Sequence, residues 1–373
     1  MLSRRRSSPS ASTPVPLSLA FACLAILGPG LLGTAVAADY PDPVEGDYVI
    51  ENFEFHDGQT IPEMTVHYTT VGEPDGEPVL VLHGTNGTGG GMVSEGFAGA
   101  LFGPGQPLDA AEHYLVLPDA IGAGGSSKPS DGMRAKFPRY NYDDMVEAQY
   151  RLLKDHLGID HLRLVIGNSM GGMLAWTWGI EHPDYMDAIV PMASLPGPMS
   201  GRNWMMRRMV IDAVRTDPAW KGGDYTEQPP NLRTQSAWFG LATSGGNLAL
   251  QKAGATREQA DAVVDERLAN QKVGDANDTM YQWDASRDFD PSADLEKITA
   301  RVLVINSADD ERNPPELGVL EEAMPRIADG EVYIIPESED TTGHGTTGGQ
   351  AALYAEPLGK FLASLPASEA KAP

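Results

Sequence analysis

This chain carries, in this order, a serine, a carboxylate and a histidine whose side chains could together carry out acyl transfer. The first is Ser169, which stands in the pattern Gly-Asn-Ser-Met-Gly at residues 167–171. An apolar run at 162–166 precedes the pattern and helical spacing follows it. The glycines two residues to either side allow a sharp turn, because a Cβ at either position would clash as the backbone folds back. We therefore expect Ser169 at a strained strand-to-helix turn, with its Oγ exposed as a nucleophile.

A carboxylate and a histidine come later, each after a predicted strand. The strand at 302–305 leads into Asp309 and Asp310, and the strand at 331–335 leads to His344. The order serine, acid, histidine suits a nucleophile whose proton passes to an imidazole that a carboxylate orients. We assign His344 as the general base and Asp310 as the acid. Asp309 is the alternative acid; Asp310 is preferred because it lies four residues before a pair of prolines, as in related loops.

An oxyanion formed on the acyl carbon needs two convergent backbone N–H donors, each worth about 2.7–4 kcal/mol in comparable enzymes. Met170, directly after the nucleophile, is expected to supply one of them. The glycine-rich loop 83–91, which follows a short apolar strand, is expected to supply the other. Thr85 is our choice within this loop and Asn86 is the alternative. The loop lacks the Gly-Lys-Ser/Thr ending of a phosphate-binding loop, so phosphate binding is disfavoured.

The elements that would hold these residues alternate between strands and helices. Two stretches with alternating apolar and polar residues, 48–55 and 64–71, predict an antiparallel pair of strands. Short apolar strands with helical patterns between them then indicate βαβ units and a parallel sheet. These strands are predicted at residues 78–82, 114–117, 162–166, 188–192, 302–305 and 331–335.

A change of pattern after the fourth of these parallel strands predicts an inserted helical cap. Between residues 195 and 298 the chain carries Trp and Met residues among helical patterns, without strong strand signals. The predicted fold class is therefore α/β, with a mostly parallel sheet, flanking helices and a cap. The predicted parts are a first core segment 38–195, the cap 196–298, a second core segment 299–365 and a flexible tail 366–373.

Residues 1–37 have the pattern of a secretory signal peptide. A run of three arginines, 4–6, precedes an apolar stretch, 15–32, and Ala35-Val36-Ala37 matches the small-residue cleavage site. We expect a periplasmic or secreted protein, exported by the Sec or the twin-arginine route. Retention of the segment as a membrane anchor is the disfavoured alternative, because prolines and glycines interrupt it. Cleavage would remove Cys23, the only cysteine.

The composition narrows the classes of partner. The formal net charge is −25, which disfavours nucleic acid and anionic membranes as partners. We expect a small-molecule acyl ester as substrate, no nucleic acid, and no membrane contact once the signal is cleaved. The oligomeric state is open, with a homodimer among the alternatives.

Four segments together resemble the α/β-hydrolase superfamily: HGTNGTG at 83–89, GNSMGGM at 167–173, SADDERNPP at 307–315 and TGH at 342–344. Within that superfamily, the serine turn and DPAWKGGDY at 217–225 resemble the homoserine O-acetyltransferase group. The likeness covers most of residues 48–365. It implies acyl transfer through a serine, with no metal and no organic cofactor.

Two positions depart from that group. Its cap carries an arginine for substrate recognition at the position that Ile211 occupies here, although Arg207 and Arg208 lie one turn away. Its histidine is followed by an aspartate that meets the amino group of homoserine, and here Gly345 stands at that place. The acyl-transfer machinery therefore matches the group, while the residues that recognise homoserine do not.

These observations favour a serine hydrolase that cleaves an ester or related acyl bond through an acyl-Ser169 intermediate. The alternative is an acyltransferase that moves an acyl group from acyl-CoA to an alcohol. Export favours hydrolysis, because acyl-CoA is not supplied outside the cytoplasm. A non-catalytic protein that uses the same pocket for binding is a third reading. The acyl chain and the leaving group are left open.

Overall fold

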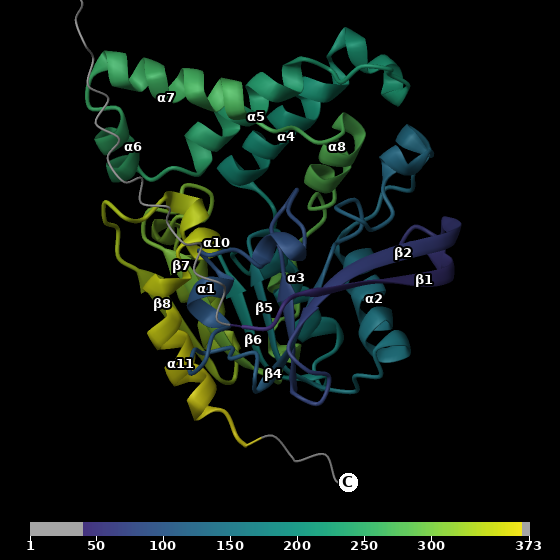
Figure 1. Ribbon diagram of the computed structural model, residues 1–373, viewed down its shortest axis with the longest axis vertical. Helices are drawn as coiled ribbons and strands as arrows, with labels where there is room; N and C mark the ends of the chain where they lie inside the picture. The colour runs from purple at the N-terminus through teal and green to yellow at the C-terminus, as the bar shows by residue number, and fades with distance from the viewer. Residues whose placement is uncertain (1–39, 368–373) are drawn as a thin grey trace, which may run out of the picture. The chain divides into compact units, whose positions relative to one another are not determined.

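The computed structural model describes residues 40–367, and one sheet of eight strands forms its centre (Figure 1). The strands are β1 (Val44–Glu54), β2 (Thr60–Val71), β3 (Glu77–Leu82), β4 (His113–Pro118), β5 (Leu162–Asn168), β6 (Met186–Met192), β7 (Arg301–Ser307) and β8 (Gly330–Ile335). Their order across the sheet is β1-β2-β4-β3-β5-β6-β7-β8. The pairs β1·β2 and β2·β4 are antiparallel, and all the remaining pairs are parallel. The predicted antiparallel pair and the predicted parallel strands are thus confirmed.

Each central strand is buried on both faces, which explains its continuous apolar run. In β3, Leu80 and Leu82 belong to the hydrophobic core on one face, whereas Val79 and Val81 belong to the core on the other. Helices α2 (Tyr142–Arg151) and α3 (Met170–Glu181) contribute to the first core. Helices α1 (Ala98–Leu101) and α11 (Ala355–Ser364) contribute to the second. The short helices α9 (Val319–Ala323) and α10 (Thr346–Gly349) lie in the segments around β8.

The chain between β6 and β7 holds the helices of the predicted cap, which lie above the sheet in Figure 1. They are α4 (Gly201–Arg215), α5 (Asn231–Thr243), α6 (Asn247–Ala253), α7 (Arg257–Asn270) and α8 (Ala276–Asp284). A separate hydrophobic cluster joins α4, α5 and α8 through Ile211, Phe239 and Trp283. The cap therefore has its own small core, held over the ends of the strands that carry the chemical residues.

Two predictions fall on residues whose structure is not described. The signal peptide at 1–37, including Cys23, lies outside the described residues, as does most of the predicted tail, 368–373. Among residues 40–367, no helix is both long enough and apolar enough to cross a membrane.

Candidate active site

Ser169 stands at the turn between β5 and α3 with a positive φ of 57°. Few residues other than glycine adopt this conformation, so the serine backbone is strained. The flanking glycines explain how the turn closes. A Cβ on Gly167 would lie 2.1 Å from the carbonyl oxygen of Gly171, and a Cβ on Gly171 would lie 2.1 Å from that of Leu82. Both contacts are impossible, so the close approach of β5, α3 and β3 depends on glycine at these two positions.

A continuous chain of hydrogen bonds connects the three residues that the sequence singles out. The Oγ of Ser169 lies 2.8 Å from Nε2 of His344. On the other side of the ring, Nδ1 lies 2.9 Å from both carboxylate oxygens of Asp310. All three side chains are buried, with at most 6% of each residue exposed. The expectation that Oγ of Ser169 is exposed is therefore wrong: the turn is strained as expected, but the serine is enclosed beside His344. Because Nδ1–H donates to the carboxylate, Nε2 is left as an acceptor for the serine proton.

The structure separates the two candidate acids. Asp310 accepts hydrogen bonds from the backbone N–H groups of Arg312 and Asn313, at 2.8 and 3.0 Å, in addition to its contact with His344. Asp309 points elsewhere and accepts from the N–H of Gly343 and from a threonine hydroxyl. Asp310 is therefore the carboxylate that meets the histidine, and Asp309 fastens the loop on which that histidine stands.

The electrostatics of the site keep His344 neutral near pH 7. Burial lowers the pKa of His344 below its ordinary value of 6.5, and the positive charges of Arg312 and Arg207 lower it further, against the opposing effect of Asp310. Burial works to raise the pKa of Asp310, but its interaction with His344 and its backbone hydrogen bonds outweigh this, so that pKa is lowered. A neutral imidazole beside an ionised carboxylate is the state that a general base requires.

One of the two expected oxyanion donors, Thr85, lies in the loop after β3, whereas Met170 begins α3 directly after the nucleophile. A Cβ on Gly84 would lie 3.5 Å from the Cβ of Ser169, so this loop passes directly beside the nucleophile. Asn86, the alternative donor, gives its N–H to Oε1 of Gln282 at 2.6 Å and is therefore occupied. Among the described residues, the backbone N–H groups of Thr85 and Met170 have no hydrogen-bond partner, which leaves both available for an oxyanion.

Two buried side chains behind this loop hold it in shape. His83 donates from Nδ1 to the carbonyl of Gly84, and its Nε2 accepts the N–H of Ala120. Asp119 accepts from the N–H groups of Gly89 and Gly125, at 2.6 and 2.8 Å. Our sequence reasoning missed Asp119, although its position directly after β4, at the edge where the other chemical residues lie, was an available signal.

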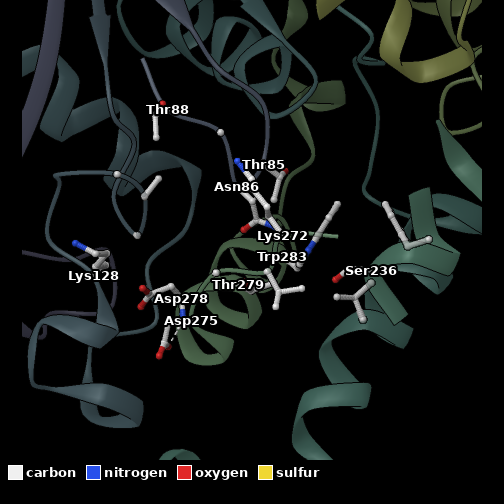
Figure 2. Close-up of a pocket in the computed structure, with 18 of the residues that line it drawn as sticks. Thr85, Asn86, Thr88, Lys128, Ser236, Lys272, Asp275, Asp278, Thr279 and Trp283 are labelled. Atoms are coloured by element: carbon white, nitrogen blue, oxygen red, sulfur yellow. Dashed lines mark hydrogen bonds between the residues drawn. The ribbon is translucent and has the colours of Figure 1, made fainter. Parts of the chain in front are cut away.

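A cavity of about 780 Å³ lies between the strand ends and the cap (Figure 2). Figure 2 shows Thr85 and Asn86 in the middle of the view, with Lys128 toward one side and Ser236 toward the other. The cap contributes Phe239 and Trp283 to the wall, and the loop after β7 contributes Arg312. Within residues 40–367, no group of three or more His, Cys, Asp or Glu side chains is arranged to hold a metal ion.

The positions that depart from the homoserine O-acetyltransferase pattern have distinct surroundings. Ile211 is fully buried in the cap core. Arg208 lies on the surface and pairs with Asp212 at 2.9 Å, while Arg207 is fully buried behind Trp283, so neither lines the cavity. Gly345, next to the histidine, offers no side chain to a substrate.

The chain matches a family model described as "alpha/beta hydrolase fold" over residues 77–338. The homoserine O-acetyltransferase of Haloferax prahovense is 35% identical over 227 residues, which make up 55% of this chain and 53% of that protein. A probable acyltransferase of Methanothermobacter thermautotrophicus is 28% identical over 281 residues, 73% of this chain and 85% of that protein. The chain spans about half the length of the curated homoserine O-acetyltransferases it matches.

Solved structures with both kinds of activity in their names share this fold. Homoserine O-acetyltransferase from Bacillus anthracis has a TM-score of 0.76 at 21% identity, covering 88% of this chain and all of that one. Esterase E22 has a TM-score of 0.75 at 18% identity, covering 86% of this chain and all of that one. At these identities the likeness shows a shared fold, and the reaction has to be argued from the site.

Proposed function

The chain belongs to the alpha/beta hydrolase fold family, and from this premise we propose that it is a serine hydrolase that cleaves an ester or related acyl bond. One observation carries the proposal: the unbroken hydrogen-bonded chain from Ser169 through His344 to Asp310. The strained turn that carries the serine and the two open N–H groups of Thr85 and Met170 support the same chemistry.

In the proposed reaction, His344 Nε2 takes the proton of Ser169 as Oγ bonds to the acyl carbon. The N–H groups of Thr85 and Met170 stabilise the oxyanion, and Asp310 stabilises the imidazolium. The bond to the leaving group then breaks, and His344 gives that group its proton, which leaves an acyl-serine. In the second half, His344 deprotonates a water molecule that attacks the acyl carbon, and the proton returns to the serine oxygen.

Acyl transfer to an alcohol is the second candidate, supported by the names of the relatives. It requires the same acyl-serine, with an alcohol in place of water in the second half. Homoserine is a poor candidate for that alcohol, because Ile211 is enclosed in the cap core and Gly345 has no side chain to meet an amino group. As a further part of the proposal, export directed by residues 1–37 would place the protein where water, and not acyl-CoA, is abundant.

Serine-directed labelling tests the proposal. We expect the purified protein to react with a fluorophosphonate probe and to hydrolyse p-nitrophenyl acetate, and Ser169→Ala to do neither while its thermal unfolding stays cooperative. Undiminished labelling of the Ser169→Ala protein would overturn the proposal. The two candidates are separated by thiol release from acetyl-CoA, with and without homoserine or simple alcohols. Thiol release that depends on the alcohol would establish transfer instead of hydrolysis.

A further inference from the structure

Arg312 connects the triad to the cavity. It lies two residues after Asp310, to which its backbone N–H donates a 2.8 Å hydrogen bond. Its side chain leaves this loop in the direction of the cap and lines the cavity together with Thr85 and Trp283. A positive charge thus stands in the wall of the cavity that also contains the proposed oxyanion donor.

The partners of this guanidinium are all uncharged. It lies 4.5 Å from the ring centre of Phe239. Its Nε donates to the carbonyl of Thr243 at 3.3 Å, and its Nη2 donates to Oγ of Ser244 at 2.7 Å. Among the described residues, no carboxylate forms an ion pair with Arg312 and no group accepts a hydrogen bond from Nη1. One nitrogen of a half-buried arginine is therefore available to a ligand.

The nearest acids are already engaged. Asp310 is occupied by His344 and by backbone N–H groups. Glu311 accepts from the N–H groups of Gly245 and Gly246 through Oε1 and from the N–H of His344 through Oε2. Neither carboxylate can turn to neutralise Arg312 without giving up contacts that hold the triad or the cap.

A second cation without an ion pair, Arg207, interacts electrostatically with Arg312. Arg207 is fully buried and lies 4.9 Å from the ring centre of Trp283. It donates to the uncharged side chains of Asn203 and Ser286 and also interacts with Tyr142. Burial, together with the charge of Arg207, lowers the pKa of Arg312 to about 9. A cation that is shielded from water without forming an ion pair is costly. The charges of Asp310 and Glu311 offset part of this cost for Arg312, but neither carboxylate forms an ion pair with it. A bound anion would relieve that cost.

We propose that Arg312 recognises a carboxylate on the substrate, so that the protein acts on esters that carry a negative charge. This inference rests on the proposed hydrolase function and names its substrate class. A carboxylate fits better than a phosphate for two reasons. Nη1 is the one guanidinium nitrogen of Arg312 without an acceptor among the described residues, and the net charge of −25 opposes a second negative charge on the ligand. The arginine that we propose to bind the carboxylate thus lies in the loop after β7. It does not lie at the α4 position where the homoserine O-acetyltransferase group has its arginine and this chain has Ile211.

Matched esters test this proposal, each charged ester being compared with its isosteric primary amide. In one arm the carboxylate is on the acyl side: the p-nitrophenyl monoester of succinic acid against that of succinamic acid, corrected for spontaneous hydrolysis. In the other arm it is on the alcohol side: acetoxyacetate against acetoxyacetamide. The measured quantity is the ratio of kcat/KM for the charged ester to kcat/KM for the amide.

We expect Arg312→Met to lower this ratio about 10- to 100-fold in one of the two arms, which is about 1.4–2.8 kcal/mol at 1.4 kcal/mol per tenfold. The arm that responds shows which side of the ester carries the charge. Arg208→Met, the same change on the exposed face of α4, should leave the ratio unchanged. An unaltered ratio in both arms for Arg312→Met would overturn the proposal.

Binding measured without turnover keeps this inference separate from the proposed function. Calorimetry on the Ser169→Ala protein compares acetoxyacetate with acetoxyacetamide, and the succinate monoester with its amide, and needs no substitution at Arg312. Preference for a charged ligand supports the carboxylate site even if Ser169→Ala turned out to retain esterase activity. Equal affinity for the charged ligand and its amide in both pairs would overturn the proposed carboxylate site. Because Arg312 is intact in this experiment, the result holds even if Arg312→Met does not fold.

Discussion

Replacing Asp310 by asparagine tests the proton path, because the substitution keeps the shape of the side chain and removes its charge. The N–H groups of Arg312 and Asn313 both donate to Oδ1, at 2.8 and 3.0 Å. An asparagine would keep its oxygen at this position to satisfy the two donors. Its NH2 group would then occupy the position of Oδ2, which lies 2.9 Å from Nδ1 of His344.

Oδ1 also lies 2.9 Å from Nδ1, but in the variant it is an uncharged oxygen that already accepts two backbone N–H groups. We therefore expect the NH2 group to face Nδ1 and to reverse the tautomer of the histidine. Nδ1 becomes the acceptor, so Nε2 carries the proton and cannot take one from Ser169. In comparable triads this change lowers kcat about 10⁴-fold, which corresponds to about 5 kcal/mol of transition-state stabilisation. We expect a loss of this size for Asp310→Asn, measured as kcat with p-nitrophenyl acetate. Thermal unfolding should show that the fold persists.

Asp309→Asn is the matched control, because it makes the same change one residue earlier in the same loop. Asp309 accepts hydrogen bonds from the N–H of Gly343 and from the hydroxyls of Thr341 and Ser307, and no hydrogen bond joins it to His344. We expect its loss of activity to stay within about tenfold, the size of one weakened hydrogen bond. A tenfold or smaller loss for Asp310→Asn, or equal losses for the two variants, would refute this proton path.

Three further predictions concern the base, the turn and the cap. The pKa of His344 lies below 6.5, and only the neutral ring accepts a proton. We therefore expect kcat/KM to fall with decreasing pH through a midpoint below 6.5. A pH–rate profile with a midpoint above 7 would contradict this expectation. Gly171→Ala places a Cβ 2.1 Å from the carbonyl oxygen of Leu82, so urea unfolding should show a loss of about 3 kcal/mol, whereas Gly349→Ala, which meets open space, should stay within about 0.5 kcal/mol. Glu311→Gln removes a charged acceptor from His344 N–H, so kcat/KM should fall about tenfold; an unchanged value would show that this contact does not orient the base.

The features that could be predicted from sequence depend on neighbours along the chain. The parallel strands are short apolar runs because both faces of the sheet are covered, and this burial can be read from composition alone. The serine turn could be predicted because the atoms that exclude a side chain at its two glycines are close in sequence or on an adjacent strand. A Cβ on Gly167, for example, would collide with the carbonyl oxygen of Gly171, four residues later. The positions of Asp310 and His344 followed from the rule that residues after parallel strands meet at one edge of the sheet.

The features that could not be predicted depend on the cap. Thr85 and Asn86 are adjacent and chemically equivalent as backbone donors. They differ only because Gln282, nearly two hundred positions away, takes the N–H of Asn86. Asp309 and Asp310 are likewise equivalent until the loop is folded and turns them in different directions. Arg312 reads in the sequence as one more charged residue of an acidic turn, and its role depends on Phe239 and Ser244 of the cap.

Consecutive residues of the loop after β7 therefore couple three parts of the site. Asp310 orients the base, Glu311 joins the backbone of that base to the cap segment after α5, and Arg312 lies between the cap and the cavity. A displacement of the cap would thus disturb the N–H contact of His344 and the position of Arg312 in the cavity wall at the same time. If Arg312 binds the substrate as proposed, this loop couples substrate binding to proton transfer. An anion at Arg312 would also cancel a positive charge that lowers the pKa of His344, so a charged ester would make the base that acts on it more basic.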